Sequence, residues 1–155
     1  MCIFLCSLSN CEKDPDPTPQ LPPKTQEGKN TFGCLVNGQV WLPKGGGLLI
    51  GLACDYSQGT LLINANNGNT DESIKINLLI NDTGMIEING EQNQNIYYRK
   101  GLNYFYADSL SIGYLTITKL DTINKIIAGT FYFDAVKNTT RYEIREGRFD
   151  LKLYN

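Results

Sequence analysis

The sequence predicts an all-β domain, an antiparallel meander that closes as a β-sandwich or a flattened β-barrel. Apolar and polar residues alternate with period two through most of residues 31–155. Clusters of glycine, asparagine and aspartate separate these runs, as turns do between strands. No segment keeps a 3.6-residue apolar period over three turns. The runs indicate about ten strands in a single domain, and closure would protect the edges of their sheet.

Two hairpins are predicted at the start of the domain. Residues 32–36 and the return strand at Val40–Trp41 flank Asn37-Gly38, a strong two-residue hairpin signal because both residue types tolerate positive φ. Residues 48–56 and 60–65 form the next pair, which turns at Ser57-Gln58-Gly59.

The middle of the chain begins with a polar segment, Asn64–Glu72, which is predicted to be a solvated loop. Its carboxylates and carboxamides are not at the offsets of an EF-hand, so calcium is not expected there. Residues 74–80 and 85–88 follow as strands. Tyr97-Tyr98 and Tyr104-Phe105-Tyr106 predict two aromatic strands.

Three long strands are predicted to complete the domain, at residues 110–120, 126–136 and 141–154. The alternation in the last of them changes phase at Glu146-Gly147, which predicts a β-bulge.

The N-terminus has the features of an export signal. Residues 1–10 are apolar and uncharged, as in a signal peptide. Leu8-Ser9-Asn10-Cys11 resembles the lipobox of bacterial lipoproteins, in which the signal is cut before a cysteine that receives the lipid. The resemblance implies that Cys11 carries a membrane anchor. Residues 11–30 would be an acidic linker that holds five of the six prolines and spans roughly 50 Å at ~3.1 Å per residue.

Two further stretches resemble an uncharacterised family of Bacteroidota lipoproteins, a domain of unknown function. They are Thr31–Trp41, and Ala128–Val136 followed by Glu146–Asp150. Glu12-Lys13-Asp14 also resembles the acidic export signal of such lipoproteins. These resemblances imply a lipid-anchored outer-membrane protein at the cell surface, or alternatively on the periplasmic leaflet. They imply no activity.

Composition excludes several function classes. The chain has no histidine, which removes Ser-His and Cys-His catalytic pairs and histidine-ligated zinc. Its 14 basic residues are scattered and the net charge is -2, so nucleic-acid binding is not expected. Neither a metal nor a cofactor is predicted.

Cys34 and Cys54 are an even pair inside the domain, which in an exported protein makes them candidates for a disulfide. Two buried free thiols are the alternative. The pattern Asp-Ser/Thr-apolar resembles an O-glycosylation site of Bacteroidota and marks Ser109 and Thr122. The same pattern is common in ordinary turns.

Aromatic side chains are the candidate ligand contacts, because aromatic faces stack on sugar rings. Neighbouring residues of a strand point to opposite faces, so only part of the set can be exposed, and core packing is the alternative. The candidates are Trp41, Tyr97, Tyr98, Tyr104 and Tyr106.

Two functions remain open. The first is a tethered, non-catalytic binding module for a glycan or an envelope protein. The second is a structural component of the envelope that pairs an exposed sheet edge with a partner strand. Catalysis is not expected, although Asp134 and Asp150, near Glu143, could form the carboxylate pair of a hydrolase.

Overall fold

The computed structural model describes residues 19–47, 50–91, 93–110 and 113–154. These residues form 11 β-strands and no helix, which confirms the all-β prediction. No helix among them is long and apolar enough to cross a membrane. The strands are β1 (Thr31–Val36), β2 (Gln39–Trp41), β3 (Leu52–Ser57), β4 (Thr60–Asn67), β5 (Glu72–Leu79), β6 (Gly84–Ile88), β7 (Tyr97–Lys100), β8 (Asn103–Ala107), β9 (Gly113–Asp121), β10 (Ile126–Lys137) and β11 (Thr140–Lys152).

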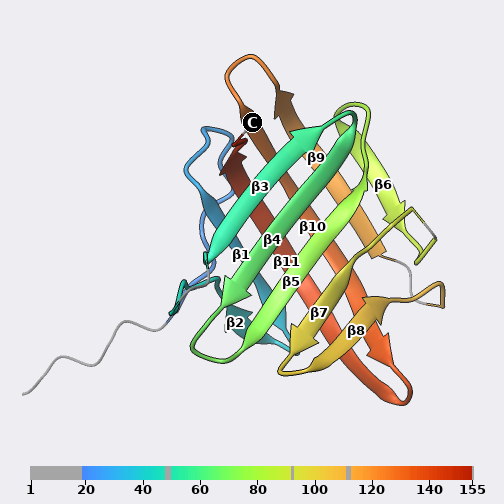
Figure 1. The fold of residues 1–155 in the computed structure, drawn as a ribbon. Coiled ribbons are helices and arrows are strands. Elements are labelled where there is room, and N and C mark those ends of the chain that lie inside the picture. Colours follow the sequence, from blue (N-terminus) through green and yellow to red (C-terminus); the bar gives the residue numbers. More distant parts are fainter. Residues whose placement is uncertain (1–18, 48–49, 92, 111–112, 155) are drawn as a thin grey trace, which may run out of the picture.

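All strands belong to one antiparallel sheet with the order β2-β1-β11-β10-β8-β7-β5-β4-β3 (Figure 1). The long strand β10 pairs with β9 over Ile126–Tyr132 and with β8 at Ala135 and Val136. Strand β6 pairs with β9 outside the main path. Because β10 pairs with both β9 and β8 along the same edge, the sheet curls there and folds back over itself.

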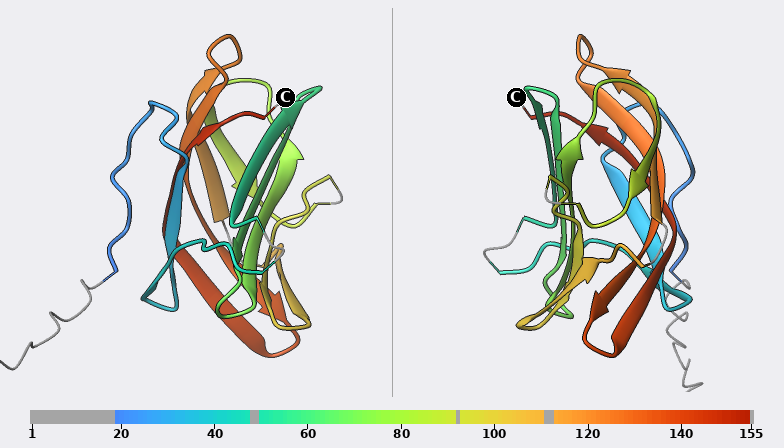
Figure 2. Two further views of the ribbon diagram at one scale, coloured as in Figure 1. Left: turned by 60° about the vertical axis from the view of Figure 1, so that its left-hand side comes forward. Right: turned by 90° about the vertical axis from the view of Figure 1, so that its right-hand side faces the viewer.

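The curled sheet forms two facing layers (Figure 2). One contains β1, β9, β10 and β11, and the other contains β3, β4 and β5. Both a sandwich and a flattened barrel fit this arrangement. The layers are also joined near one end, where the Lys44 amide donates to the Asn66 carbonyl at 2.8 Å and the Gly68 amide donates to the Lys44 carbonyl at 2.9 Å.

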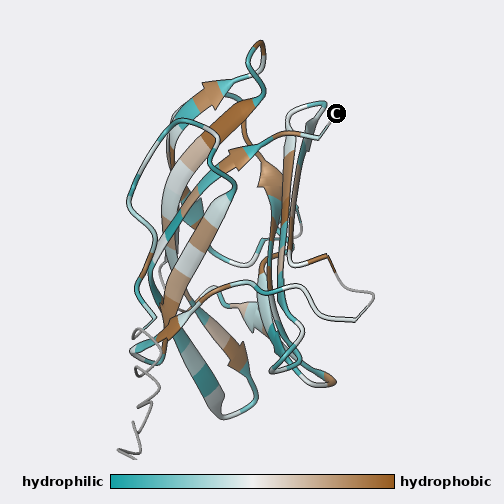
Figure 3. Ribbon diagram, turned by 90° about the vertical axis from the view of Figure 1, so that its left-hand side faces the viewer, coloured by the Kyte–Doolittle hydropathy of each residue, from teal (hydrophilic) through white to brown (hydrophobic). Residues whose placement is uncertain are grey.

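The core lies between the layers and follows the strand alternation. Cys54, Ile63 and Ile76 form one inward row across β3, β4 and β5, and all three are buried. Along the strands of both layers, hydrophobic segments alternate with hydrophilic ones in Figure 3. Burial of one face of each strand accounts for the period-two pattern in the sequence.

Several predicted turns are confirmed. Asn37 and Gly38 have φ values of 48° and 80°, and Gln58 and Gly59 have values of 50° and 76°. The predicted bulge is confirmed too: Glu146 has a φ of 49°, and the pairing of β10 with β11 shifts register between Phe131 and Phe133.

Other predicted boundaries are wrong. The segment Asn64–Glu72 is not a long loop, because β4 continues to Asn67 and β5 begins at Glu72. Asn64 pairs with Lys75 in the ladder, so its polar side chain lies on the outer face of a regular strand. Leu110 lies in a turn and not in the predicted strand, and among the described residues β9 spans Gly113–Asp121.

The predicted linker does not extend to residue 30. Asp150 of β11 binds the segment before β1: its Oδ2 accepts hydrogen bonds from Thr25 Oγ1 at 2.5 Å and from the Glu27 amide at 3.0 Å, and its Oδ1 accepts from the Gly28 amide at 2.6 Å. Pro22 packs on Gly33, where an added Cβ would lie 2.8 Å from Pro22 Cδ. This segment runs along the outside of the layer that contains β1 (Figure 2).

Candidate functional site

Three tyrosines form a continuous aromatic surface on the outer face of β7 and β8, here called the tyrosine patch. They are Tyr97, which is half-buried, and Tyr104 and Tyr106, which are 41% and 52% exposed. The ring centroid of Tyr97 lies 5.1 Å from that of Tyr104 and 5.7 Å from that of Tyr106. The rings of Tyr104 and Tyr106 are stacked, with centroids 6.3 Å apart.

The hairpin register produces the patch. Tyr97 pairs with Tyr106, and the alternation of β8 places Tyr104 on the same outer face. The intervening residues Tyr98 and Phe105 pair with each other on the inner face and are buried. The predicted aromatic strands thus divide their side chains between the core and the surface.

One charged group, the Lys75 ammonium, borders the patch. The Lys75 ammonium lies 5.9 Å from the Tyr97 ring centroid, within the range of a cation–π contact. Burial, followed by the adjacent phenols Tyr104 and Tyr106, raises the pKa of Tyr97. The phenol therefore stays neutral at physiological pH and offers a hydroxyl beside the ring faces.

Two of the five candidate ligand contacts, Trp41 and Tyr98, do not belong to this patch and follow the core-packing alternative. Both are buried and converge on Glu72. Trp41 Nε1 donates to Glu72 Oε2 at 2.9 Å, and the Tyr98 hydroxyl donates to Oε1 at 2.7 Å. Thr70 Oγ1 donates to Oε2 at 2.9 Å, and the Lys100 ammonium lies 3.4 Å from Oε1.

Glu72 is thereby satisfied on both oxygens, and it lines a 330 Å³ cavity together with Trp41 and Tyr98. Burial raises its pKa, but the hydrogen bonds from Tyr98, Thr70, Trp41 and Lys100 outweigh burial and hold the pKa below its usual value. The sequence contains a signal for Glu72 as an inward-facing acceptor, although Glu72 was not among the predicted site residues. Glu72 has the same parity as Ile74, Ile76 and Leu78, so it is an acid in phase with an inward face.

The predicted disulfide does not form in the structure, where Cys34 and Cys54 are separate buried thiols. The Cys54 carbonyl accepts from the Tyr154 amide, whereas Cys34 lies opposite the bulge of β11 between Arg145 and Arg148. Between these two contacts the part of β11 from Arg148 to Lys152 alone spans about 13 Å, while a disulfide needs Cα atoms within ~7 Å. Burial raises the pKa of both thiols, that of Cys54 to about 12.

Asp134 and Asp150 do not form a catalytic pair. Asp150 pairs with Ala128, six residues before Asp134 on β10, which separates the two carboxylates by roughly 20 Å against the ~5–9.5 Å that glycosidases use. Asp150 holds the N-terminal segment, as described above.

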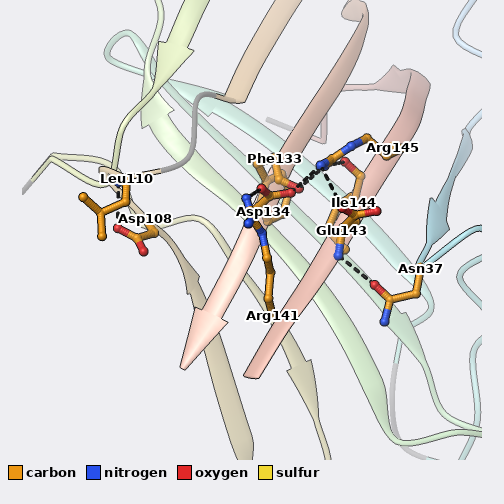
Figure 4. A network of polar contacts seen from close by, with 9 residues as sticks. All are labelled: Asn37, Asp108, Leu110, Phe133, Asp134, Arg141, Glu143, Ile144 and Arg145. Carbon is orange, nitrogen blue, oxygen red and sulfur yellow. Dashed lines mark hydrogen bonds and ion pairs between the residues drawn. The ribbon is translucent and has the colours of Figure 1, made fainter. Parts of the chain in front are cut away.

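Asp134 lies between two guanidinium groups (Figure 4). Its Oδ2 accepts from Arg141, and its Oδ1 lies 2.6 Å from Arg145 Nη2. Arg145 also lies 3.7 Å from Glu143 Oε1. Burial raises the pKa of Asp134, but the two arginines outweigh burial and hold it below its usual value. Asp134 and Glu143 therefore serve as ion-pair partners of these arginines.

The remaining predicted residues are exposed or lie outside the described part of the chain. Ser109 and Thr122 are exposed, and Asp108 Oδ1 accepts from the Leu110 amide at 2.9 Å, an ordinary turn contact. Glycosylation at both positions stays a prediction. Cys11 lies outside the described residues. Within those residues, no three Cys, Asp or Glu side chains gather as metal ligands would.

Residues 52–150 match the protein family described as Domain of unknown function (DUF6252). The match covers more than half of the chain of 155 residues. The chain belongs to the DUF6252 family. In this DUF6252 protein the match includes Ala128–Val136 and Glu146–Asp150 but not Thr31–Trp41. No curated protein and no solved structure matches the chain.

Proposed function

We propose that this DUF6252 protein is a lipid-anchored binding module outside the cytoplasm that binds a glycan on the tyrosine patch. The observation that carries the proposal is the continuity of the Tyr97, Tyr104 and Tyr106 rings, together with the exposure of Tyr104 and Tyr106. Aromatic rings stack on the apolar faces of pyranose rings, while the phenol hydroxyls and the Lys75 ammonium supply hydrogen bonds. A core role would have buried these rings, as it does for Tyr98.

The anchor part of the proposal rests on the lipobox-like Leu8–Cys11 and on the proline-rich residues that follow it. Lipidation of Cys11 would attach the domain to the bacterial outer membrane. A position at the cell surface agrees best with the acidic residues after Cys11, and the periplasmic leaflet is the alternative.

A second candidate function is envelope assembly through the edge of β3. This strand pairs with β4 on one side, and on its other side the Tyr154 amide donates to the Cys54 carbonyl at 3.3 Å. A 390 Å³ cavity with apolar walls runs beside it, and Ile50 at its margin is 72% exposed. A protein strand added at this edge would satisfy the backbone groups of β3 and cover these side chains.

The first function is tested by binding of the full-length Cys11→Ala chain to a panel of immobilised glycans. Calorimetry then measures the affinity for each glycan that binds the protein. We expect the double variant Tyr104→Ala/Tyr106→Ala to lose at least about tenfold in affinity, since each stacked ring contributes on the order of 1 kcal/mol. Tyr154→Ala is the matched control, because Tyr154 is 69% exposed but lies outside the patch. The proposal would be contradicted if no immobilised glycan binds the protein, or if the double variant and Tyr154→Ala lose affinity equally.

A further inference from the structure

A second concave surface lies on the outer face of β6, β9, β10 and β11, on the layer opposite β3–β5. It is a 410 Å³ cavity, within the size range of small-ligand sites, and the N-terminal segment forms one wall through Lys24. The strand register places Tyr114 opposite Tyr132 and Thr116 opposite Thr130. We call it the β9–β10 cavity.

Two aromatic rings line this cavity side by side. The ring centroids of Tyr114 and Tyr132 lie 5.7 Å apart with an interplanar angle of 57°, and Tyr132 is 39% exposed. Met85 of β6, opposite Thr116, adds an apolar contact and is 69% exposed. The walls are therefore apolar and aromatic on a surface that faces outward.

The polar groups of the cavity are unused by the protein. Among the described residues, no hydrogen bond or ion pair engages the hydroxyls of Tyr114, Tyr132, Thr116 and Thr130 or the Lys24 ammonium. The one carboxylate in the lining, Glu146, is already paired with Arg148 at 3.0 Å. Four hydroxyl-bearing side chains, each able to donate and accept, thus line the cavity without a protein partner among the described residues.

We infer that the β9–β10 cavity binds a single neutral sugar ring. A pyranose presents an apolar face to the tyrosines and hydroxyls that both donate and accept, which matches the lining group by group. An anion fits less well, because one unpaired ammonium is the only uncompensated charge. The inference rests on the proposed function in that it adds a second subsite for a glycan.

The two sites share one surface. Tyr132, Asp134 and Val136 alternate on the outer face of β10, and Val136 pairs with Tyr106 of the tyrosine patch. Four residues of strand separate Tyr132 from Val136, about 13 Å. A separation of this size allows each site to be tested alone.

Met85 provides a direct reporter, because Met1 is the only other methionine of the chain. The full-length Cys11→Ala chain, labelled with ¹³C at the methionine methyls, is titrated with free glucose, galactose, mannose and N-acetylglucosamine. We expect at least one sugar to give a saturable shift of the Met85 methyl while the Met1 signal stays in place. An affinity in the millimolar range is expected for one ring in an open site.

Variants separate the cavity from the patch. Tyr132→Ala should abolish the Met85 shift, and Thr130→Val, which keeps the β-branched shape, should weaken binding by about threefold to tenfold through the lost hydroxyl. Tyr106→Ala should leave the titration unchanged. The methyl spectrum of each free variant shows whether it is folded.

The outcomes distinguish the inference from the proposed function. A silent Met85 with patch-dependent binding of a glycan overturns the inference alone. A Met85 shift that is abolished in Tyr132→Ala and weakened in Thr130→Val, without patch-dependent binding of a glycan, supports the inference and contradicts glycan binding at the tyrosine patch. A shift that survives both Tyr132→Ala and Thr130→Val overturns the inference. So does a shift caused only by inorganic phosphate and lost in Lys24→Gln, which would indicate an anion site.

Discussion

Phe131 of β10 lies directly over Gly147 of β11. The two residues are cross-strand partners, and a Cβ added to Gly147 would lie 2.5 Å from Cδ2 and Cε2 of the Phe131 ring. The neighbouring pair repeats the arrangement with the strands exchanged: Gly129 faces Phe149, and an added Cβ would lie 2.7 Å from its Cζ. Two Gly-x-Phe segments therefore interlock, each glycine receiving the ring of the other strand.

Gly147→Ala should destabilise the fold by about 1–3 kcal/mol or more, because the added methyl group forces the Phe131 ring out of its position. Urea unfolding at pH 7 measures the change. Gly38→Asn is the control, since Gly38 has a φ of 80°, which asparagine tolerates, and nothing lies within 4 Å of its added Cβ. Equal unfolding midpoints for the two variants would contradict the steric argument.

Asp150→Asn should release the N-terminal segment. The variant weakens three hydrogen bonds to a buried carboxylate and should cost about 2–3 kcal/mol of unfolding free energy. Hydrogen exchange at the Gly28 amide should accelerate. Glu27→Gln, at an exposed side chain of the same segment, should leave exchange unchanged. Protection of Gly28 equal to that of the parent would show that another contact holds the segment.

The Asp150 interaction also predicts a pH dependence. Burial raises the pKa of Asp150, but the bonds from Thr25, Glu27, Gly28 and Lys29 outweigh it and hold the pKa below its ordinary value. The carboxylate thus contributes its full stabilisation above the unfolded pKa of about 3.9, and this is lost as the pH falls through the lower folded pKa. The stability difference between parent and Asp150→Asn should shrink on acidification. A difference that grows would refute this sign.

Glu72→Gln should disturb the Trp41 environment. The substitution removes the charge that accepts from Trp41 and Tyr98, and should cost about 1–3 kcal/mol. Because Trp41 is the single tryptophan, its fluorescence reports on this site directly. We expect a changed emission spectrum for Glu72→Gln and none for Glu91→Gln, a substitution at an exposed turn residue. An unchanged spectrum in both would remove Glu72 from the Trp41 site.

Cys34 and Cys54 should resist iodoacetamide in the native protein. Both thiols are buried and burial raises their pKa, so few thiolates are available to react. After unfolding in guanidinium both should be alkylated, as peptide mass spectrometry would reveal. A Cys34–Cys54 linked peptide recovered without reductant would instead show the disulfide that the sequence predicted.

Lipidation is tested by expression in a bacterium that lipidates its own lipoproteins. The full-length chain should incorporate a palmitate analogue, and Cys11→Ala should not. Protease digestion of intact cells then separates surface display from a periplasmic position. Absence of label in the parent would remove the anchor from the proposed function.

The sequence by itself determined the local features of this protein. Asn37-Gly38 and Gln58-Gly59 form their turns because few residue pairs tolerate positive φ. The bulge at Glu146 was predicted from a change of phase in the apolar–polar alternation. The alternation separated Tyr98 from Tyr97 but did not say which of them faces solvent. The outer and inner faces exist only once the sheet curls.

Tertiary structure decided the rest, because the deciding partners are distant in sequence. Asp150 binds Gly28 across 122 positions, so a segment with the composition of a free linker becomes part of the domain. Trp41 meets Glu72 across 31 positions, which takes it from the candidate ligand surface into a buried cluster. Period and turn chemistry act over a few residues, whereas exposure and ion pairing depend on which strands the curled sheet brings together.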